Sequence, residues 1–424
     1  MQTQAAKAFE DPVVSDLIDR EATRQNATLN MIAAESTAPA AVLAAIGSVF
    51  NNKPAEGYPG RRYHRGCGIV DELEELAVKR ATELFGAEHA NVQVHSGVQA
   101  NVAVYAALLK PGDRVVSMSL RHGGHLSHGA SASITGAFYD FRQYGVRADT
   151  ELIDYDEVRD LAREHRPRLI VAGGSSYPRV IDYALLRTIA DEVQAPLLVD
   201  MSHIAGLIAA GVLPSPVPHA QFVTSTTYKT LLGPHGGFIL CGAEHAAAID
   251  RAVFPGTQGT PSMGQIAGKA VCFAYAETEE FRDIQQATVD NAAALAGSLA
   301  DAGFRLVSGG TDNHLVLVDL RPKGLTGDRA EEALEAVGIL CNRNPIPFDP
   351  APIRQTSGIR IGTPGVSLRG IRRPEMLEIG ALIRDVLENI DDPAVARRAT
   401  ERVSELCRRF PLPGTADGQP ARRL

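Results

Sequence analysis

One lysine in the middle of the chain, Lys229, stands between two apolar runs and constrains the fold more than any other residue. Residues 222–228 before it are rich in hydroxyl and β-forming side chains, and residues 238–241 after it are apolar, with a glycine- and proline-containing turn between. A lysine between two buried strands is costly unless its amine is neutral or bonded to a partner. A Schiff base with an aldehyde cofactor meets both conditions, and pyridoxal 5′-phosphate (PLP) is the usual such aldehyde. Taken alone, the lysine is better explained by a side chain that reaches solvent along an apolar surface.

A carboxylate, Asp200, ends another short apolar run at residues 196–199. At the carboxyl end of a parallel strand, an aspartate can keep the pyridine nitrogen of PLP protonated, so that the ring accepts electrons from Cα. Alone, Asp200 is better explained as a helix N-cap. The pair of strand ends, one with Asp200 and one leading to Lys229, favours PLP.

The chain alternates short apolar runs with amphipathic segments. Strands are predicted at residues 91–94, 113–118, 168–172 and 196–200, and helices at residues 70–85 and 183–194. This alternation predicts an α/β fold with a parallel sheet covered on both faces. Ligands bind such sheets at the carboxyl ends of the strands, where Ser96, Asp200 and Lys229 fall. Ser96 and Gly97 also open a helix, and the N–H groups at a helix N-terminus favour a phosphate.

Bulk properties exclude several other classes of protein. A chain of 424 residues is long enough for two domains. Its net charge of −8 argues against a nucleic-acid surface. Five scattered cysteines without CxxC spacing fit reduced cytosolic thiols, and no run is apolar enough to span a bilayer or to act as a signal peptide, so we expect a cytoplasmic protein. His122, His125 and His128 have no acidic or cysteine neighbour in sequence, and we predict no metal site there.

Six segments resemble serine hydroxymethyltransferase and occur in the order of that family. They are residues 55–63 (AEGYPGRRY), 95–101 (HSGVQAN), 122–126 (HGGHL), 200–211 (DMSHIAGLIAAG), 226–237 (TTYKTLLGPHGG) and 357–364 (SGIRIGTP). The resemblance runs from about residue 30 to about residue 390. It implies a PLP-dependent enzyme of the aspartate-aminotransferase-like fold, with a mostly parallel seven-stranded sheet in the large domain and a smaller α+β C-terminal domain.

The domain boundaries that follow are an N-terminal arm at residues 1–30, a PLP-binding large domain at 31–280 and a small domain at 281–410. A proline- and glycine-containing tail at 411–424 is expected to be disordered. The family's active sites are shared between subunits, which implies a homodimer or a tetramer that binds a small amino-acid substrate and neither nucleic acid nor membrane. The basic loop at residues 51–66, with Arg61, Arg62 and Arg65, is interpreted as an anion-binding loop at the subunit boundary.

The resemblance also assigns the site. Lys229 is the expected Schiff-base lysine, Asp200 the partner of the pyridine nitrogen and His125 the residue face-on against the ring. The other expected cofactor-binding residues are Ser96, Gly97, Ser175, His203, Tyr228 and Gly259. Glu56 is the candidate acid/base for a substrate hydroxyl, and Arg360 the candidate clamp for the substrate carboxylate. Further expected substrate-binding residues are Tyr63, His64 and Asn344. Without the resemblance, Arg360 would be interpreted as part of a surface salt bridge and Glu56 as an exposed carboxylate in a turn.

Several positions depart from the family pattern. The chain has Pro54 where the family has a tyrosine that reaches the neighbouring subunit, His64 in place of a second tyrosine and Tyr228 in place of the histidine before the lysine. The remaining departures are Ala34, Val98, Thr260 and Ser262. By contrast, Tyr63, Leu120, Leu126, Glu56 and Asn344 match folate-side positions, which makes tetrahydrofolate a second candidate cofactor. We therefore expect preserved PLP binding with altered substrate handling.

Four functions remain open on these residues. The first is cleavage or formation of the Cα–Cβ bond of a β-hydroxy-α-amino acid, with serine or threonine and glycine as the amino acids. The second is a specialised threonine transaldolase that acts on a bulky aldehyde, and the third is a PLP-dependent oxygenase-decarboxylase. The fourth is a PLP-binding regulatory protein without catalysis, supported by Pro54, Ala34 and Tyr228 and opposed by the retained site residues.

Overall fold

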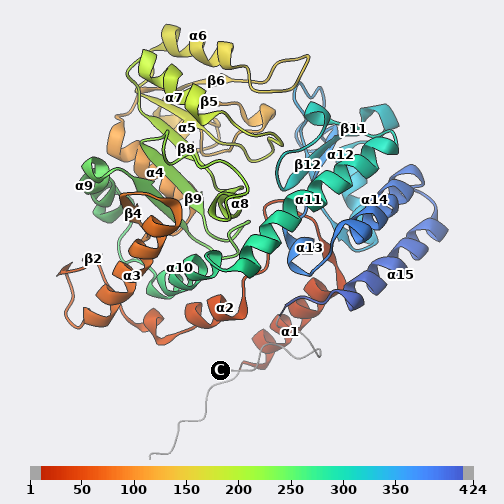
Figure 1. Ribbon diagram of the computed structural model, residues 1–424, viewed down its shortest axis with the longest axis horizontal. Coiled ribbons are helices and arrows are strands. Elements are labelled where there is room, and N and C mark those ends of the chain that lie inside the picture. The colour runs from red at the N-terminus through yellow and green to blue at the C-terminus, as the bar shows by residue number, and fades with distance from the viewer. Residues whose placement is uncertain (1–10, 414–424) are drawn as a thin grey trace, which may run out of the picture.

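Seven short strands form the central sheet of the larger part of the molecule (Figure 1). The computed structural model describes residues 11–413. Across the sheet the strands of this described part are β4 (His89–Asn91), β10 (Gly237–Cys241), β9 (Phe222–Thr226), β8 (Leu197–Asp200), β7 (Leu169–Ala172), β5 (Arg114–Met118) and β6 (Asp140–Tyr144). Only β10 is antiparallel to its neighbours, β9 and β4. The expected mostly parallel seven-stranded sheet is therefore confirmed.

Both faces of this sheet are covered by apolar cores. One strand contributes to both cores, because successive side chains along a strand point to opposite faces. In β7, Leu169 and Val171 belong to the apolar core that includes α4 (Gly97–Leu108). Ile170 and Ala172 face the other way, into the core formed with α6 (Tyr155–His165) and α7 (Tyr183–Glu192). Figure 1 shows α6 and α7 together at the β6 side of the molecule. The sheet is thus a rigid support whose strand ends hold loops in fixed positions.

The other helices and turns of the larger part complete its surface. A short hairpin joins β2 (Gly57–Tyr58) and β3 (Arg61–Arg62). The further helical segments are α2 (Ala40–Ile46), α3 (Gly68–Phe85), α5 (Ile134–Phe138), α8 (Ala205–Ala209), α9 (Ala243–Arg251) and α10 (Met263–Ala276), with short 3₁₀ or π turns at Val49–Asn52, Leu120–His122 and Ala252–Thr257. Helices α3 and α10 pack on each other and share a core with β9 and β10.

The basic loop contains a buried arginine, Arg62, which is therefore not available to bind an anion, while the interpretation of the loop as an anion-binding loop stays a prediction. The Arg62 guanidinium donates to Asp71 at 2.8 Å and to Glu74 at 2.7 Å, and its side chain is almost completely buried. It also donates to the backbone oxygens of Ala55 and Gly57. Arg62 is therefore satisfied within its own chain, and only Arg61 and Arg65 are exposed.

Two boundaries differ from the sequence-based expectation. The strand expected at residues 91–94 ends at Asn91, because Asn91 accepts the N–H of Gln93 and the oxygens of Val92 and Val94 accept hydrogen bonds from a lysine side chain. The long helical stretch at 265–302 is two helices, α10 and α11 (Glu279–Asp301). Residue Thr278 caps the second helix with its hydroxyl.

The smaller part has a four-stranded antiparallel sheet covered by helices. Its strand order is β11 (Arg305–Leu306), β12 (Leu315–Asp319), β15 (Gly358–Gly362) and β14 (Asn342–Asn344). The helices are α12 (Gly327–Ala336), α13 (Pro364–Leu368), α14 (Arg373–Glu388) and α15 (Pro393–Arg409), with 3₁₀ turns at Val307–Gly309 and Arg321–Lys323. These elements bury an apolar core of their own.

Helix α11 joins the two parts and belongs to both cores (Figure 1). Phe281 and Ile284, near its start, pack in the core of the larger part, whereas Leu295 and Leu299 pack in the smaller one. The boundary expected between residues 280 and 281 therefore falls in the first turn of a shared helix. The smaller core also contains Leu29, which lies in β1 (Leu29–Asn30) and pairs in parallel with β13 (Ile339–Leu340).

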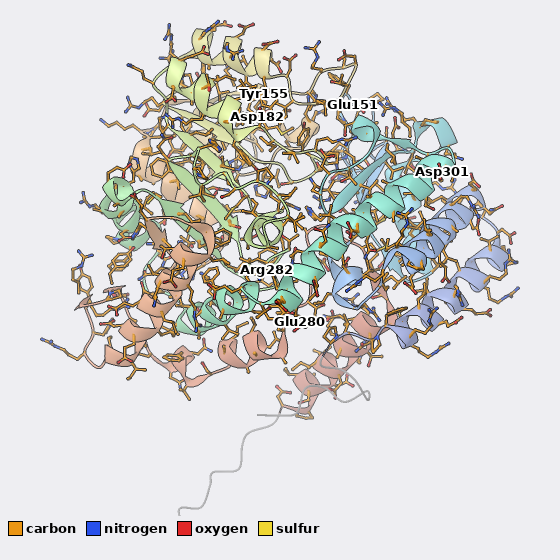
Figure 2. The ribbon with its side chains drawn as sticks, in the orientation of Figure 1. Glu151, Tyr155, Asp182, Glu280, Arg282 and Asp301 are labelled. Atoms are coloured by element: carbon orange, nitrogen blue, oxygen red, sulfur yellow. The ribbon has the colours of Figure 1, made fainter. Side chains whose placement is uncertain are left out.

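Polar contacts also connect the two parts. Glu151, in the loop after β6, accepts hydrogen bonds from Arg305 and from the N–H of Ser308, each at 2.7 Å. Figure 2 labels Glu151 at the border of the two parts. Nearby, Arg179 pairs with Asp312 at 2.8 Å. We refer to these five residues as the Glu151 clasp.

Helix α1 (Pro12–Ala27) begins the described chain and has no buried residue. It packs beside α15 and presents its apolar side chains to the outside. The tail expected to be disordered at 411–424 lies outside the described residues from residue 414 on. None of the helices in the described part is both long and apolar enough to cross a bilayer.

Candidate active site

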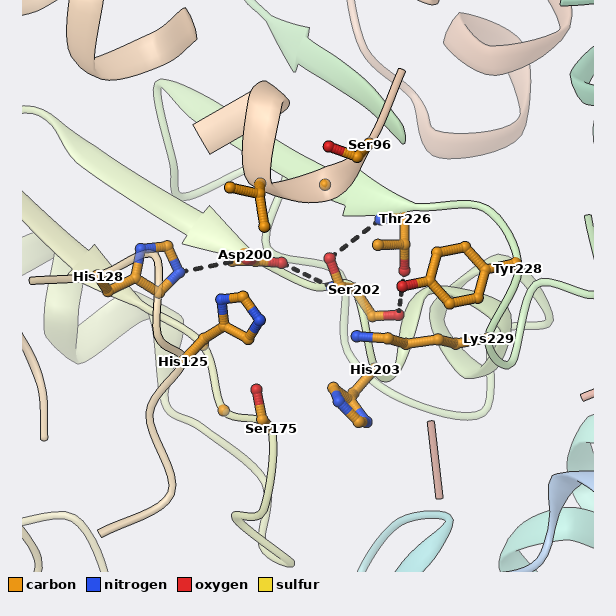
Figure 3. Close-up of a pocket in the computed structure, with 14 residues that line it drawn as sticks. Ser96, His125, His128, Ser175, Asp200, Ser202, His203, Thr226, Tyr228 and Lys229 are labelled. Carbon is orange, nitrogen blue, oxygen red and sulfur yellow. Dashed lines mark hydrogen bonds and ion pairs between the residues drawn. The ribbon is translucent and has the colours of Figure 1, made fainter. Parts of the chain in front are cut away.

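A cavity opens where the parallel strands of the large sheet end (Figure 3). It is built from the loops that follow β7, β8 and β9, from the histidine-containing loop after β5 and from the first turn of α4. Its lining residues are Ser96, Gly97, Val98, His125, His128, Gly173, Gly174, Ser175, Asp200, Ser202, His203, Thr226, Tyr228 and Lys229. The structure thus brings together eight of the predicted site residues: Ser96, Gly97, His125, Ser175, Asp200, His203, Tyr228 and Lys229.

Asp200 is held at the end of β8 by three hydrogen-bond donors. Its carboxylate accepts the N–H of Ser202 at 3.0 Å and the amide of Asn101 at 2.8 Å, and it lies 3.2 Å from Nε2 of His128. Burial alone would raise the pKa of Asp200, but the hydrogen bond with His128 and the nearby imidazoles hold it well below its ordinary value. Asp200 is therefore an ionised carboxylate at any pH near neutrality.

The space beside Asp200 depends on one glycine. Gly173 has a φ of +127°, and a Cβ atom there would lie 2.2 Å from the backbone oxygen of Asp200. Any other residue would force β7 and β8 apart at the point where both reach the cavity.

His125 and His128 lie on the loop after β5 and surround the same carboxylate from the side of the cavity (Figure 3). Nδ1 of His128 lies 2.6 Å from the hydroxyl of Tyr105, and Nδ1 of His125 lies 2.7 Å from the hydroxyl of Ser127. Burial lowers the pKa of His125 to about 4, so its ring is neutral near pH 7. A neutral, flat ring at the wall of the cavity is suited to contact with an aromatic cofactor.

The three histidines of this loop do not lie together in the structure: His122 is separate, whereas His125 and His128 lie beside Asp200. His122 points away from the cavity and accepts the N–H of Val146 at 3.0 Å. His125, His128 and Asp200 bring potential ligand atoms within 4.8 Å of one another. Each of these three groups already has a hydrogen-bond partner, so the cluster has the character of a hydrogen-bonded carboxylate site.

Lys229 lies three residues beyond the end of β9 and is only 6% exposed. Burial lowers the pKa of its amine to about 8, while the Asp200 carboxylate acts in the opposite direction. The residue before it, Tyr228, stacks on the ring of His235, with 4.1 Å between ring centroids. The neighbouring backbone is fixed because the N–H of Thr226 donates to the hydroxyl of Ser202 at 3.0 Å. The amine is thus both buried and readily deprotonated, as a Schiff-base lysine requires.

The first turn of α4 supplies an anion site opposite the lysine. Ser96 caps the helix by accepting the N–H of Gln99 at 3.1 Å, which leaves its own hydroxyl proton free to donate. Gly97 follows directly, and a Cβ there would lie 2.6 Å from a methyl group of Thr226. The helix is twelve residues long, so its backbone N–H groups and dipole favour a phosphate at this end.

Arg360, on β15 of the smaller part, lies next to the cavity and contacts its lining residue Ser175. Its Nη1 donates to the backbone oxygen of Ser175 at 2.5 Å, and its Nε donates to Asn342 at 3.1 Å. No carboxylate of the described residues lies within ion-pair distance of it, and none of their hydrogen bonds uses Nη2. Burial lowers the pKa of the guanidinium to about 10, which still leaves it charged near pH 7. It is therefore a half-buried cation whose forked donors face no anion among the described residues.

His203 closes the floor of the cavity together with His314. Nδ1 of His203 lies 3.3 Å from Nε2 of His314. Burial lowers the pKa of both rings, that of His314 to about 3 and that of His203 well below its ordinary value. The pair is neutral and is not a source of protons near pH 7.

Six predicted residues are not among those that line this cavity: Arg360, which contacts the lining residue Ser175, and five others. Glu56 and Gly259 lie next to each other, and Glu56 accepts a hydrogen bond from Thr260 at 3.1 Å. Tyr63 is 76% exposed and packs edge-on against Phe254, and His64 is exposed beside it. Asn344 donates to the oxygen of Pro345, so that Asn342 and not Asn344 contacts Arg360.

Several functional neighbours were missed by reasoning from the sequence. Asn101, His128 and Tyr105 form the hydrogen-bond network around Asp200, and Asn342 holds Arg360. Asn101 could be predicted from helical spacing, because it lies one helical turn after Gly97 and can point toward the strand ends. No local pattern marks Asn342, since its contact depends on the register between β14 and β15.

The residues present fit PLP. The cavity offers a buried amine that is readily deprotonated, an ionised carboxylate at a strand end, a neutral histidine ring and a helix N-terminus for the phosphate.

A comparison with family models supports the same conclusion. The model for serine hydroxymethyltransferase matches residues 8–383, which is most of the chain. The chain therefore belongs to the serine hydroxymethyltransferase family, whose members are PLP-dependent transferases of fold type I.

Proposed function

We propose that this family member makes or breaks the Cα–Cβ bond of a β-hydroxy-α-amino acid, with glycine as the common amino-acid fragment. One observation carries the proposal: Arg360 is a half-buried cation that contacts Ser175 at the cavity, acts electrostatically on Lys229 and has no acidic partner among the described residues. A charge that is partly withdrawn from water is stabilised when an anion neutralises it. The α-carboxylate of an amino acid is the matching ligand, because a guanidinium binds a carboxylate through two parallel hydrogen bonds.

PLP bound in this cavity withdraws electrons from the substrate Cα. Asp200 supports this by remaining ionised, which keeps a proton on the pyridine nitrogen. Its three donors also fix the carboxylate, so that little reorganisation is needed during the reaction.

Lys229 binds the cofactor and then moves protons. With a pKa of about 8, the amine of Lys229 is deprotonated far more easily than that of an ordinary lysine, and its neutral form can accept a proton from the substrate amino group. The protonated form can return a proton to Cα of the glycine fragment. Burial of the amine limits exchange with water while this happens.

Glu56 is the group that we assign to the β-hydroxyl proton. It lies against Thr260 and outside the cavity of its own chain. We therefore propose that Glu56, together with Tyr63 and His64, completes the site of a second copy of the chain. The exposed apolar side chains of α1, Val13, Val14, Leu17 and Ile18, support such an assembly, because apolar patches on a protein surface mark interfaces.

The identity of the acceptor is the finer part of the proposal. Transfer to tetrahydrofolate is one candidate, supported by the retained Tyr63, Leu126 and Asn344. Threonine transaldol chemistry on a bulky aldehyde is the second, and Pro54 favours it, because an exposed proline brings neither the ring nor the hydroxyl of the family tyrosine. A cytoplasmic location fits the five cysteines, which are all buried and unpaired.

The test incubates purified holoenzyme with L-serine plus tetrahydrofolate, and separately with L-threonine plus an aromatic aldehyde. Oxygen consumption and carbon dioxide release are followed in parallel. Glycine formation that depends on folate selects hydroxymethyl transfer, whereas acetaldehyde release with a new β-hydroxy amino acid selects the transaldolase. Oxygen consumption with carbon dioxide release and no aldol product contradicts the Cα–Cβ assignment. A cofactor spectrum that does not respond to any amino acid identifies a binding protein without catalysis.

The matched control is Arg360→Lys, which keeps the charge but loses the forked geometry. We expect a higher KM for the amino acid with a smaller change for the aldehyde.

A further inference from the structure

A second buried lysine, Lys269, lies in α10 and is only 1% exposed. Its amine donates to the backbone oxygens of Val92 at 2.6 Å and of Val94 at 2.9 Å. No carboxylate of the described residues lies within ion-pair distance of Nζ; Glu74, a nearby acidic residue, is occupied by Arg62 and Gln93. A buried cation without a counter-ion needs a reason to be retained.

The position of Lys269 provides one. Val94 lies two residues before Ser96, the first residue of the anion-binding turn, so the two hydrogen bonds fix the path of the chain into that turn. The oxygen of Val94 is also near the N–H of Gly237, which begins β10.

The glycines of the Lys229 loop make room for the same amine. A Cβ at Gly236 would lie 2.7 Å from Cε of Lys269, and a Cβ at Gly237 would lie 2.7 Å from the backbone oxygen of Ser96. Lys269, the anion-binding turn and the segment after Lys229 are therefore packed against one another with no spare space. The oxygen of Gly236 accepts the N–H of Thr227, two residues before Lys229.

We propose that Lys269 is a positioning residue for the phosphate of the cofactor: it holds the turn at Ser96 in place and contributes a buried positive charge behind it. This rests on PLP as the ligand of the cavity and is independent of which amino acid is the substrate. Burial lowers the pKa of Lys269 to about 7, and Glu74 and Cys272 act against that shift. A phosphate bound nearby favours the charged amine, so the site and the ligand stabilise each other.

The test compares two ligands that differ only in the phosphate. The full-length chain is freed of cofactor by dialysis and titrated with PLP and with pyridoxal, and binding is followed by absorbance. For Lys269→Met we expect PLP affinity to fall roughly ten- to a hundredfold, as for the loss of an interaction with a charged group, while pyridoxal affinity changes less than about twofold. Inorganic phosphate should compete with PLP in the wild-type chain and compete more weakly in the variant.

Two further variants keep the result interpretable. Gly236→Ala leaves the lysine in the chain but displaces its amine, and we expect the same selective loss of PLP affinity, smaller in size. This variant decides the question if Lys269→Met does not fold. Lys79→Met, at an exposed position on α3, should change neither affinity. Equal weakening of PLP and pyridoxal, or no change for either, would overturn the proposal.

Discussion

Lys229 is a buried lysine with an amine pKa of about 8, and its place in the cavity distinguishes it from the buried Lys269. Borohydride reduction of the holoenzyme followed by peptide mapping should therefore place a pyridoxyl label on Lys229. Lys269 is the informative competitor, because burial lowers the pKa of its amine as well. A label on Lys269 would contradict the assignment of Lys229 as the Schiff-base lysine. Lys229→Ala should lose the absorbance of the cofactor–lysine bond and still retain some PLP through the other contacts.

The charge of Asp200 can be removed with little change in shape. In Asp200→Asn, the amide no longer stabilises a proton on the pyridine nitrogen, and one hydrogen bond to Asn101 or His128 is replaced by a contact between donors. We expect kcat to fall by a factor on the order of 10² to 10⁴, with PLP still bound. Steady-state kinetics with a PLP assay of the purified variant would check both. As a control, Asp156→Asn, at an exposed position on α6, should leave kcat unchanged.

For single residues, the sequence predicts the side chains that lie at strand ends. It misses the side chains that hold them in place through hydrogen bonds. Lys229, Asp200 and Ser96 follow recognisable patterns, and the structure brings all three into one cavity. Asn101, His128 and Asn342 do not, because their contacts depend on helix rotation and strand register, which a local pattern does not fix. Glu56, Tyr63 and His64 stay assigned by resemblance, since a single chain leaves them outside its own cavity.

Helices and strands are predicted well where burial produces a periodic apolar pattern. Their ends are predicted poorly where a side chain forms the hydrogen bonds that terminate the element. The sheet strands at β5, β7 and β8 lie within one residue of their expected bounds. The shorter β4 ends early because Asn91 and Lys269 take over its backbone hydrogen bonds, which is a tertiary effect. The separation of α10 from α11 depends on the Thr278 cap, a local signal that the apolar pattern obscures.

The Glu151 clasp is a contact between elements that a single substitution can remove. Glu151 is nearly buried and accepts hydrogen bonds from Arg305 and from the N–H of Ser308. Glu151→Ala would leave the backbone N–H of Ser308 and part of Arg305 without an acceptor, so we expect a loss of about 1–3 kcal/mol in the free energy of unfolding. Urea unfolding of the variant, next to the exposed control Glu164→Ala, would measure it. An unchanged midpoint would show that the Glu151 hydrogen bonds do not contribute to stability and that α11 and the other contacts between the two parts are sufficient.

For the whole molecule, the proposed assembly predicts a homodimer or a dimer of dimers. Light scattering on the purified chain would show it, and Leu17→Asp in α1 should shift it toward the monomer, because a buried charge opposes association. The variant should also lose activity, since Glu56 would no longer reach a second cavity. A fully active monomer would rule out the shared site.

Stability should fall in weak acid because of the buried histidines. The folded-state pKa values of His125 and His314 are about 4 and about 3, below the unfolded value of about 6.5. Between pH 6.5 and 4 the unfolded chain therefore binds more protons than the folded chain, and the free energy of unfolding decreases as the pH falls. The expected slope is on the order of 1 kcal/mol per pH unit for each histidine. Denaturant midpoints at pH 7 and pH 5 would measure it; His314→Asn should reduce the slope, and His64→Asn, at an exposed position, should not.

The pairing of β1 with β13 has a consequence for biosynthesis. Leu29 emerges early from the ribosome, but its partner Ile339 and most of the core that it completes are made last. At roughly 5–20 residues per second, the nascent segment around Leu29 waits on the order of tens of seconds with an apolar side chain uncovered. The large sheet can form during that interval, whereas the smaller core cannot. The nascent chain thus depends on its C-terminal third to bury the segment around Leu29. Truncation near the C-terminus should leave a species that chaperones retain.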